Sequence, residues 1–270
     1  MGKQTAKPTG KGSIKATVAK RAEAKEATIK HASRRNGAER KEEDSDTTLS
    51  QHAYHLLRND ILNGHFTAGG PLRLEALKER YGLSFSPLRE ALNRLQSERL
   101  VMSSALRGFR IAELSLDEMW DSIETRIVLE TEALRRSIKR GGDDWEGAVM
   151  GAFHALSSCA KRLTKLDRQR NEAEDEELEQ RHRDFHMALI GASESRWLSE
   201  LSAQLYAQTE RYRRPLLGGM SWTSARNIHG EHEAIMKAAL NRDAKKAMEL
   251  LSLHYRKTGE FIERKFKAAA

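Results

Sequence analysis

The stretch Gly82–Leu95 reads GLSFSPLREALNRL, and it joins a turn directly to a helical pattern. Leu88, Leu92 and Leu95 recur at the three- and four-residue spacing that places side chains on one face of a helix. The pattern therefore predicts a short amphipathic helix over residues 88–97, whose apolar stripe packs inward.

Ser86 and Pro87 explain why this helix should begin so abruptly. Serine is a preferred N-cap residue, and proline suits the first helical position, where a missing N–H costs nothing. Arg89 and Arg94 fall off the apolar stripe. The sequence thus predicts a helix that starts at a tight turn and presents arginines on its polar face.

The segments around this helix complete a recognisable pattern. Two helices are predicted before it and two short strands after it, joined by a turn at Arg107-Gly108. The ranges are 49–62 and 74–82 for the helices, and 100–104 and 109–111 for the strands, while TAGGPLR between the first two helices has turn chemistry. This order is typical of a winged helix-turn-helix, in which the helix after the turn enters the major groove of DNA.

A solvated helix face is the alternative interpretation of Arg89 and Arg94, because surface charge usually serves that purpose. Together with the turn, the hairpin and a basic N-terminal segment, DNA contact is the better interpretation. The predicted DNA-contacting residues are Arg73, Ser84, Phe85, Ser86, Arg89, Arg94, Arg107 and Gly108.

The residues PLREAL at Pro87–Leu92 and the Arg107-Gly108 pair resemble the DNA-binding domain of the GntR family of bacterial transcription regulators. The resemblance covers about residues 53–113 and implies binding to double-stranded DNA at a palindromic operator as a homodimer. The family usually has arginine where this chain has Phe85, and a common glycine is replaced by Arg99. Phe85 either contacts a thymine methyl group or packs within the domain.

The chain beyond Ser115 reads as helix throughout. A capping box at Ser115–Glu118 opens a helix to about residue 139, and Gly141-Gly142 ends it. Further helices are predicted over 144–172, 175–192, 195–214, 222–241 and 243–265. The expected fold is therefore mainly α, with a winged helix-turn-helix over 48–113 and an all-helical bundle over 114–265.

Four histidines fall on the inward faces of three predicted helices. His182 and His186 are four residues apart on an apolar side, and His232 and His254 lie on the apolar stripes of the last two helices. Since the turn near 241–243 makes those two helices antiparallel, His232 and His254 should lie at similar heights, roughly 15 and 18 Å from it.

A single inward histidine is usually a core residue with a satisfied ring, but four of them need many polar partners. A divalent metal satisfies all four, and a histidine-rich set suits zinc or nickel better than magnesium or calcium. The predicted metal ligands are His182, His186, His232 and His254.

Residues from about 115 to 263 resemble the helical FCD domain of FadR-like GntR regulators. The markers are Arg126–Glu130, Phe185-His186, Glu231-His232 and His254. Metal-binding members have aspartate where this chain has His182. The resemblance implies a small organic acid effector, such as a short dicarboxylate, with Arg126, Glu130 and Arg213 as candidate contacts.

The net positive charge of the chain is concentrated near its N-terminus. Residues 1–41 hold twelve Lys and Arg and three Glu, a balance of +9 against +8 for the whole chain. Such a segment, poor in large apolar residues, is expected to be a disordered tail over 1–47, either a DNA-attracting arm or a solubilising extension. No apolar run approaches the ~20 residues of a membrane span, and no signal peptide is recognisable, which favours a cytoplasmic protein.

Three functions compete at this stage. The first is a transcription regulator that acts as a repressor and releases DNA on binding a small acid. The second is a metal-dependent enzyme using the histidines, but no general base is apparent beyond Glu130. The third is a nucleoid-type protein, which leaves the histidines unexplained. The sequence favours the first function and predicts no catalytic residues.

Overall fold

The computed structural model describes residues 2, 48–104, 108–217 and 226–269. The chain divides into two units at His52, and the second unit, Ala53–Ala270, contains the two predicted domains except for residues 48–52. Apart from Gly2, the N-terminal tail predicted over residues 1–47 lies outside the described residues, and so does Arg107, which was predicted to lie in the turn between the two strands.

The N-terminal domain is a winged helix-turn-helix, as predicted. A helix over residues 48–62 precedes α2 (Leu74–Tyr81) and α3 (Phe85–Ser97). A three-stranded antiparallel sheet follows in the order β1-β3-β2, built from β1 (Pro71–Leu72), β2 (Val101–Ser104) and β3 (Gly108–Ile111). The predicted apolar stripe of α3 is buried with side chains of the neighbouring helices: Leu57, Leu62, Leu77, Leu88, Leu92 and Leu95.

The start of α3 differs from the prediction by two residues. The helix begins at Phe85, so Ser84 takes the N-cap position in extended conformation, and Ser86 is not the cap. Pro87 is then the third helical residue. Proline is tolerated there because the first four N–H groups of a helix have no partner within the helix. The helix thus begins at a tight turn, as expected, but its N-cap is Ser84 instead of Ser86.

Strand β1 was not predicted, because its two residues lie inside a stretch with turn chemistry. Pro71 pairs with Arg110 and Leu72 with Phe109, so the strand exists only through pairing with β3. Arg99, which replaces a common family glycine, has a φ of 56°. This left-handed conformation is the one that glycine adopts without steric cost.

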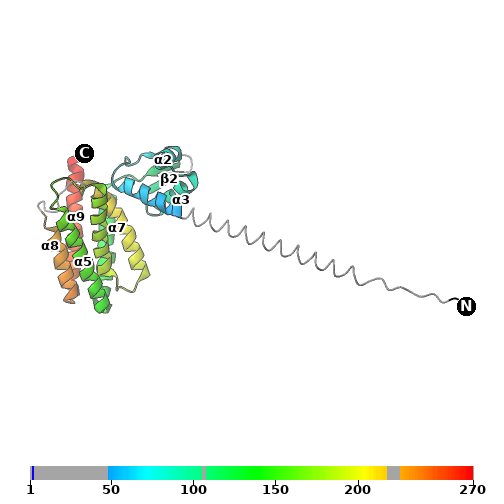
Figure 1. The fold of residues 1–270 in the computed structure, drawn as a ribbon. Coiled ribbons are helices and arrows are strands. Elements are labelled where there is room, and N and C mark those ends of the chain that lie inside the picture. Colours follow the sequence, from blue (N-terminus) through cyan, green and yellow to red (C-terminus); the bar gives the residue numbers. More distant parts are fainter. Residues whose placement is uncertain (1, 3–47, 105–107, 218–225, 270) are drawn as a thin grey trace. The chain divides into compact units, whose positions relative to one another are not determined.

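The C-terminal domain is an all-helical bundle, visible in Figure 1 as long helices lying roughly side by side. Its elements are α4 (Leu116–Arg140), α5 (Asp143–Leu163), α6 (Glu172–Ile190), α7 (Arg196–Leu217), α8 (Ile228–Leu240) and α9 (Ala244–Ala269). Two predicted ranges were wrong. The helix expected over 144–172 ends at Leu163, and within the described residues the helix expected from 222 begins at Ile228 after the cap Asn227.

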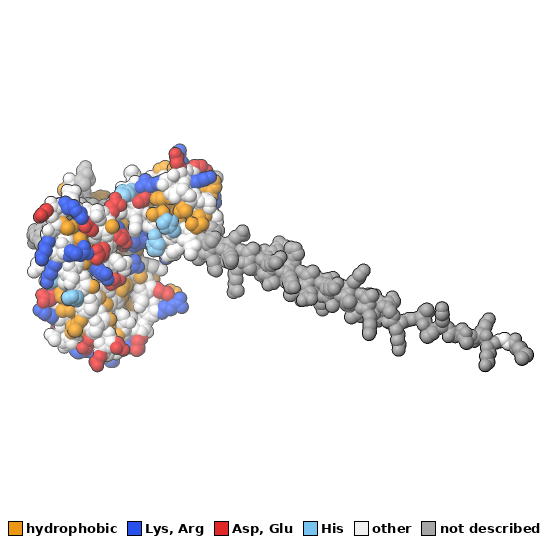
Figure 2. All heavy atoms as spheres, viewed as in Figure 1, with side chains coloured by type: hydrophobic (Ala, Val, Ile, Leu, Met, Phe, Trp, Pro, Cys, Tyr) orange, Lys and Arg blue, Asp and Glu red, His pale blue; other side chains and the backbone are white. Residues whose placement is uncertain are grey.

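The surface of the described residues is polar. Figure 2 shows side chains of both charges distributed over the visible face, with hydrophobic side chains between them. None of the helices in residues 48–104, 108–217 and 226–269 has the length and hydropathy that crossing a membrane requires.

Candidate metal and effector site

The four predicted ligand histidines meet inside the helical bundle. His182 and His186 come from α6, His232 from α8 and His254 from α9, and all four are buried. One ring nitrogen of each can be chosen so that all four atoms lie within 4.8 Å of one another. The Nε2 atoms of His182 and His186 are 3.2 Å apart. The arrangement is compact enough for four nitrogens to surround one ion.

Helical register explains why these side chains converge. His182 and His186 are one turn apart on α6, on the side that also buries Phe185. His232 lies one turn before the buried Ile235 on α8, and α9 returns antiparallel after residues 241–243, as expected. The ring centroids of His232 and His254 are 4.6 Å apart, as expected for two histidines at the same level of neighbouring helices.

Burial keeps these imidazoles neutral. It is the largest cause that lowers the pKa of His182, His186 and His232 well below the usual value, and neighbouring positive groups add to it. Burial also lowers the pKa of His254 to about 4, although Glu231 opposes the shift. Neutral imidazole is the form that coordinates metal ions.

Two tyrosines hold the outer nitrogens of the α6 histidines. The Nδ1 atom of His182 is 2.7 Å from the hydroxyl of Tyr206, and Nδ1 of His186 is 2.9 Å from the hydroxyl of Tyr255. Both hydroxyls also donate to buried or half-buried carboxylates, Tyr206 to Glu179 and Tyr255 to Glu130. With Nδ1 engaged on the outside, Nε2 of each ring faces the centre.

The carboxylate of Glu231 contacts a third histidine of the cluster, His254, directly. Nδ1 of His254 is 2.9 Å from Oε2 of Glu231, which also accepts a 2.5 Å hydrogen bond from Arg226. Burial alone would raise the pKa of Glu231, but the hydrogen bonds from His254 and Arg226 outweigh it and lower the pKa. Sequence patterns gave no signal for Tyr206, Tyr255, Glu179 and Arg226, and they named Glu231 only as a marker of the FCD resemblance.

The candidate effector contacts surround the same centre. Arg126 is buried and donates to Glu130 at 2.5 Å, to Thr209 at 2.9 Å and to the hydroxyl of Tyr255 at 3.1 Å. Arg213 is also buried and pairs with Glu179. Arg126 and Glu130 therefore form an ion pair on their own helix, and both arginines reach the tyrosines that contact His182 and His186.

The predicted DNA contacts lie on the surface of the N-terminal domain, except Arg107, which is not described. Phe85 is 42% exposed, with the ammonium group of Lys78 5.1 Å from its ring centroid. The guanidinium of Arg94 lies 3.7 Å from the ring centroid of Tyr54 and near Glu98. The other exposed members of the set are Arg73, Ser84, Ser86, Arg89 and Gly108.

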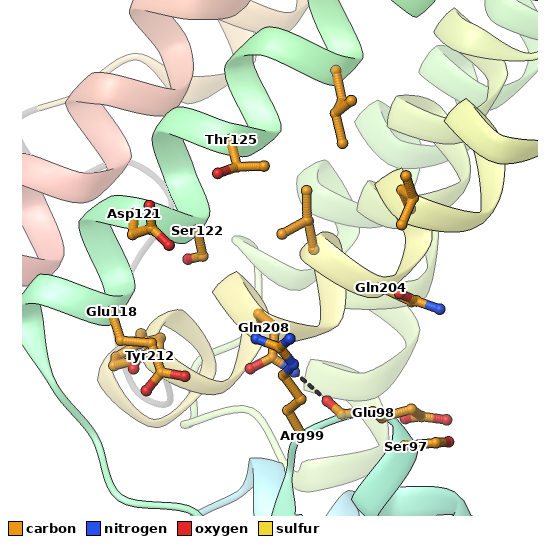
Figure 3. A pocket seen from close by; sticks show the side chains of 13 residues that line it. Ser97, Glu98, Arg99, Glu118, Asp121, Ser122, Thr125, Gln204, Gln208 and Tyr212 are labelled. Carbon is orange, nitrogen blue, oxygen red and sulfur yellow. Dashed lines mark hydrogen bonds between the residues drawn. The ribbon is translucent and has the colours of Figure 1, made fainter.

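Helix α7 contacts both the histidine cluster and residues of the N-terminal domain. Its Arg211 donates to the carbonyl oxygens of Arg99 and Ala112, each at 3.1 Å. Its Gln208 donates to the carbonyl oxygen of Glu98, just beyond α3, beside a pocket of about 450 Å³ (Figure 3). That pocket is lined by α4, α7 and residues 97–99, and none of the four histidines lines it.

Comparison with known families accounts for both domains. The profile described as "Bacterial regulatory proteins, gntR family" matches residues 49–111, and the profile described as "FCD domain" matches residues 121–257. The chain is 42% identical over 211 residues to the uncharacterized HTH-type transcriptional regulator BphR of Paraburkholderia xenovorans (strain LB400), covering 77% of this chain and 82% of that protein.

Two further proteins extend the comparison. The HTH-type transcriptional repressor GlaR of Escherichia coli (strain K12) is 34% identical over 213 residues, covering 77% of this chain and 93% of that protein. The solved structure of E. coli McbR/YncC shares the fold with a TM-score of 0.66 at 17% identity, over 81% of this chain and 98% of that one. The chain belongs to the GntR family of DNA-binding transcription regulators, in the branch that carries an FCD domain.

Proposed function

We propose that this regulator is a repressor, and that a small carboxylate controls its operator binding at a divalent metal, zinc or nickel. The proposed ligands are His182, His186, His232 and His254. The observation that carries the proposal is the convergence of four buried, neutral imidazoles on one point. When bound, the ion supplies a positive charge that a carboxylate can coordinate. Repression is supported by the similarity to GlaR, which is named as a repressor.

The charges around the histidines favour an anionic effector. Each nearby carboxylate already pairs with an arginine: Glu130 with Arg126, Glu179 with Arg213 and Glu231 with Arg226. Four neutral histidines add no negative charge, so the +2 charge of the metal is left for an external ligand to neutralise. A site with aspartate in place of His182 would carry one charge less, and its attraction for a carboxylate would be weaker.

A dicarboxylate has a second partner within this site. Arg126 and Arg213 are the candidate clamps, because guanidinium groups bind carboxylates through two parallel hydrogen bonds. Each already pairs with a glutamate, Arg126 with Glu130 and Arg213 with Glu179. The effector carboxylate would replace one of these glutamates, and that exchange would displace the tyrosine hydrogen-bonded to it.

Helix α7 is the proposed route from effector to DNA. Tyr206 contacts the histidine His182, while Gln208 and Arg211 on the same helix bind carbonyl groups of the N-terminal domain. Arg58 of the first helix donates to Glu210 at 2.7 Å. A shift of α7 that favours one arrangement of these contacts would change how the two recognition helices of a dimer are held.

The proposed homodimer follows from the way such helices read DNA. A single recognition helix contacts few base pairs, and two-fold related copies bind the two halves of a palindromic site. Val128 on α4 is 67% exposed and Leu201 on α7 is 38% exposed, on two helices that pack together. These apolar side chains are a suitable place for a second copy of the chain to bind.

Ligand-dependent release from operator DNA tests the proposal as a whole. We expect zinc- or nickel-loaded protein to leave DNA from its own promoter region when glutarate is added, and chelated protein to stay bound. The mass of the complex, measured by sedimentation, should correspond to two chains per operator. Release that is equal with and without metal would contradict the proposed mechanism.

Replacing Arg89 tests the DNA-binding face. Arg89 is exposed on α3, so Arg89→Ala should weaken operator binding without unfolding the domain. Loss of one phosphate contact should lower the slope of log affinity against log salt by about one. Arg196→Ala is the matched control, because it removes an exposed arginine from α7. An unchanged affinity and slope for the Arg89 variant would exclude it from the interface.

A further inference from the structure

We propose that Tyr206 and Tyr255 are positioning residues, which fix His182 and His186 as Nδ1–H tautomers so that both Nε2 lone pairs face one cation. The inference rests on the proposed metal site. It assigns a role to two hydroxyl groups that neither bind the metal nor contact DNA in the proposed mechanism.

Counting protons establishes the tautomer of His182. A tyrosine hydroxyl has one proton to donate and lone pairs that accept hydrogen bonds. Tyr206 donates that proton to Glu179 and accepts from Arg213 at 3.2 Å. The remaining contact, with Nδ1 of His182 at 2.7 Å, can form only if Nδ1 carries the hydrogen.

The same count applies to His186 on the other side of the cluster. Tyr255 donates its one hydroxyl proton to Glu130 and accepts from Arg126 at 3.1 Å. Its contact with Nδ1 of His186 at 2.9 Å therefore requires a hydrogen on Nδ1. Two separate chains of hydrogen bonds, each ending in a carboxylate and an arginine, lead to the same tautomer.

The two tautomers have a consequence at the centre of the site. The Nε2 atoms of His182 and His186 are 3.2 Å apart, and both carry lone pairs instead of hydrogens. These lone pairs repel each other unless a cation lies between them and the other histidines. The tyrosine–carboxylate chains thus arrange the rings for metal coordination before the ion arrives.

Removing one oxygen atom from each tyrosine tests this role. Tyr206→Phe and Tyr255→Phe keep the buried rings, and each should weaken zinc binding ~10–100-fold, the usual effect of losing such a partner. Tyr212→Phe is the matched control: it is also a buried tyrosine on α7, but its hydroxyl accepts from the backbone of Ser115. Zinc affinity is measured by competition with a chelator, and thermal unfolding checks that all three variants fold.

Nitrogen-15 NMR of the histidine rings supplies a readout that packing alone would not change. In metal-free wild type, His182 and His186 should both appear as Nδ1–H tautomers, and Tyr206→Phe should mix the tautomers of His182. Nε2–H tautomers in wild type, or zinc affinities within twofold of wild type for both variants, would overturn the inference. If wild type binds no zinc, the proposed function fails, and the NMR tautomers alone then decide this inference.

Discussion

His186→Ala is expected to abolish stoichiometric metal binding and, with it, the release of operator DNA by effector. His186 is fully buried and contributes a ring nitrogen 3.2 Å from that of His182. Removing one of four ligands leaves three and an enlarged cavity, so the affinity for the ion should fall steeply. Operator binding without effector should persist, because the recognition helix belongs to the other domain. Elemental analysis and mobility shift measure the two effects.

His229→Ala is the control for this experiment. His229 lies on α8 three residues before His232 and contacts the ring of Phe153, but it is not one of the four converging histidines. Its replacement should leave both metal content and effector response close to wild type. His232→Ala serves as a second test if the His186 variant folds poorly. Metal-free variants that still respond fully to effector would contradict the metal-dependent mechanism.

Glu130→Ala should destabilise the protein by about 3–5 kcal/mol, the usual effect of leaving one partner of a buried ion pair alone. Glu130 is fully buried and Arg126 is 2% exposed, and burial opposes the charged form of this arginine. The same substitution removes the acceptor for the hydroxyl of Tyr255. Urea unfolding with and without zinc would measure the loss and separate it from the loss of bound metal.

Glu132→Ala is the matched control on the same helix. Glu132 pairs with Arg135 and Arg136 at the surface, where solvent screens the charges, so its loss should change the free energy of unfolding little. The double variant Arg126→Met/Glu130→Met should recover part of the stability, because it removes both buried charges together. Equal, small effects of Glu130→Ala and Glu132→Ala would show that the buried pair is not a stabilising feature.

Local patterns predicted much of this fold. The apolar stripe of α3 and the histidine registers of α6, α8 and α9 depend on residues a few positions apart, so the sequence contains them directly. The first and last residues of the helices were predicted less accurately. Ser84 and Ser86 are equally good cap residues by type, and proline is tolerated throughout the first turn, so the sequence alone does not decide between the two starts.

The remaining errors have different physical origins, and two of them are long-range contacts. Strand β1 is two residues long and forms only because β3 pairs with it. The helix predicted to continue to 172 ends at Leu163, and a local capping box of Asn171 and Glu174 starts α6 several residues later. Tyr206 lies on α7, 24 residues after His182, and no periodicity links the two. The one available sequence signal is chemical: a buried imidazole needs hydrogen-bond partners, and tyrosines and carboxylates supply them.

The contacts of α7 bear on how freely the two halves of this protein can be exchanged in engineered biosensors. Residues from Tyr206 to Arg211 span about one and a half helical turns, yet they contact both a histidine of the buried cluster and the backbone at Glu98, Arg99 and Ala112. A chimera that joins a foreign DNA-reading module at Glu113 would keep the peptide connection but would have to match these carbonyl positions and Arg58. In such chimeras, effector binding should therefore control DNA binding only when the incoming module fits the contacts of α7. The length of the linker should matter less.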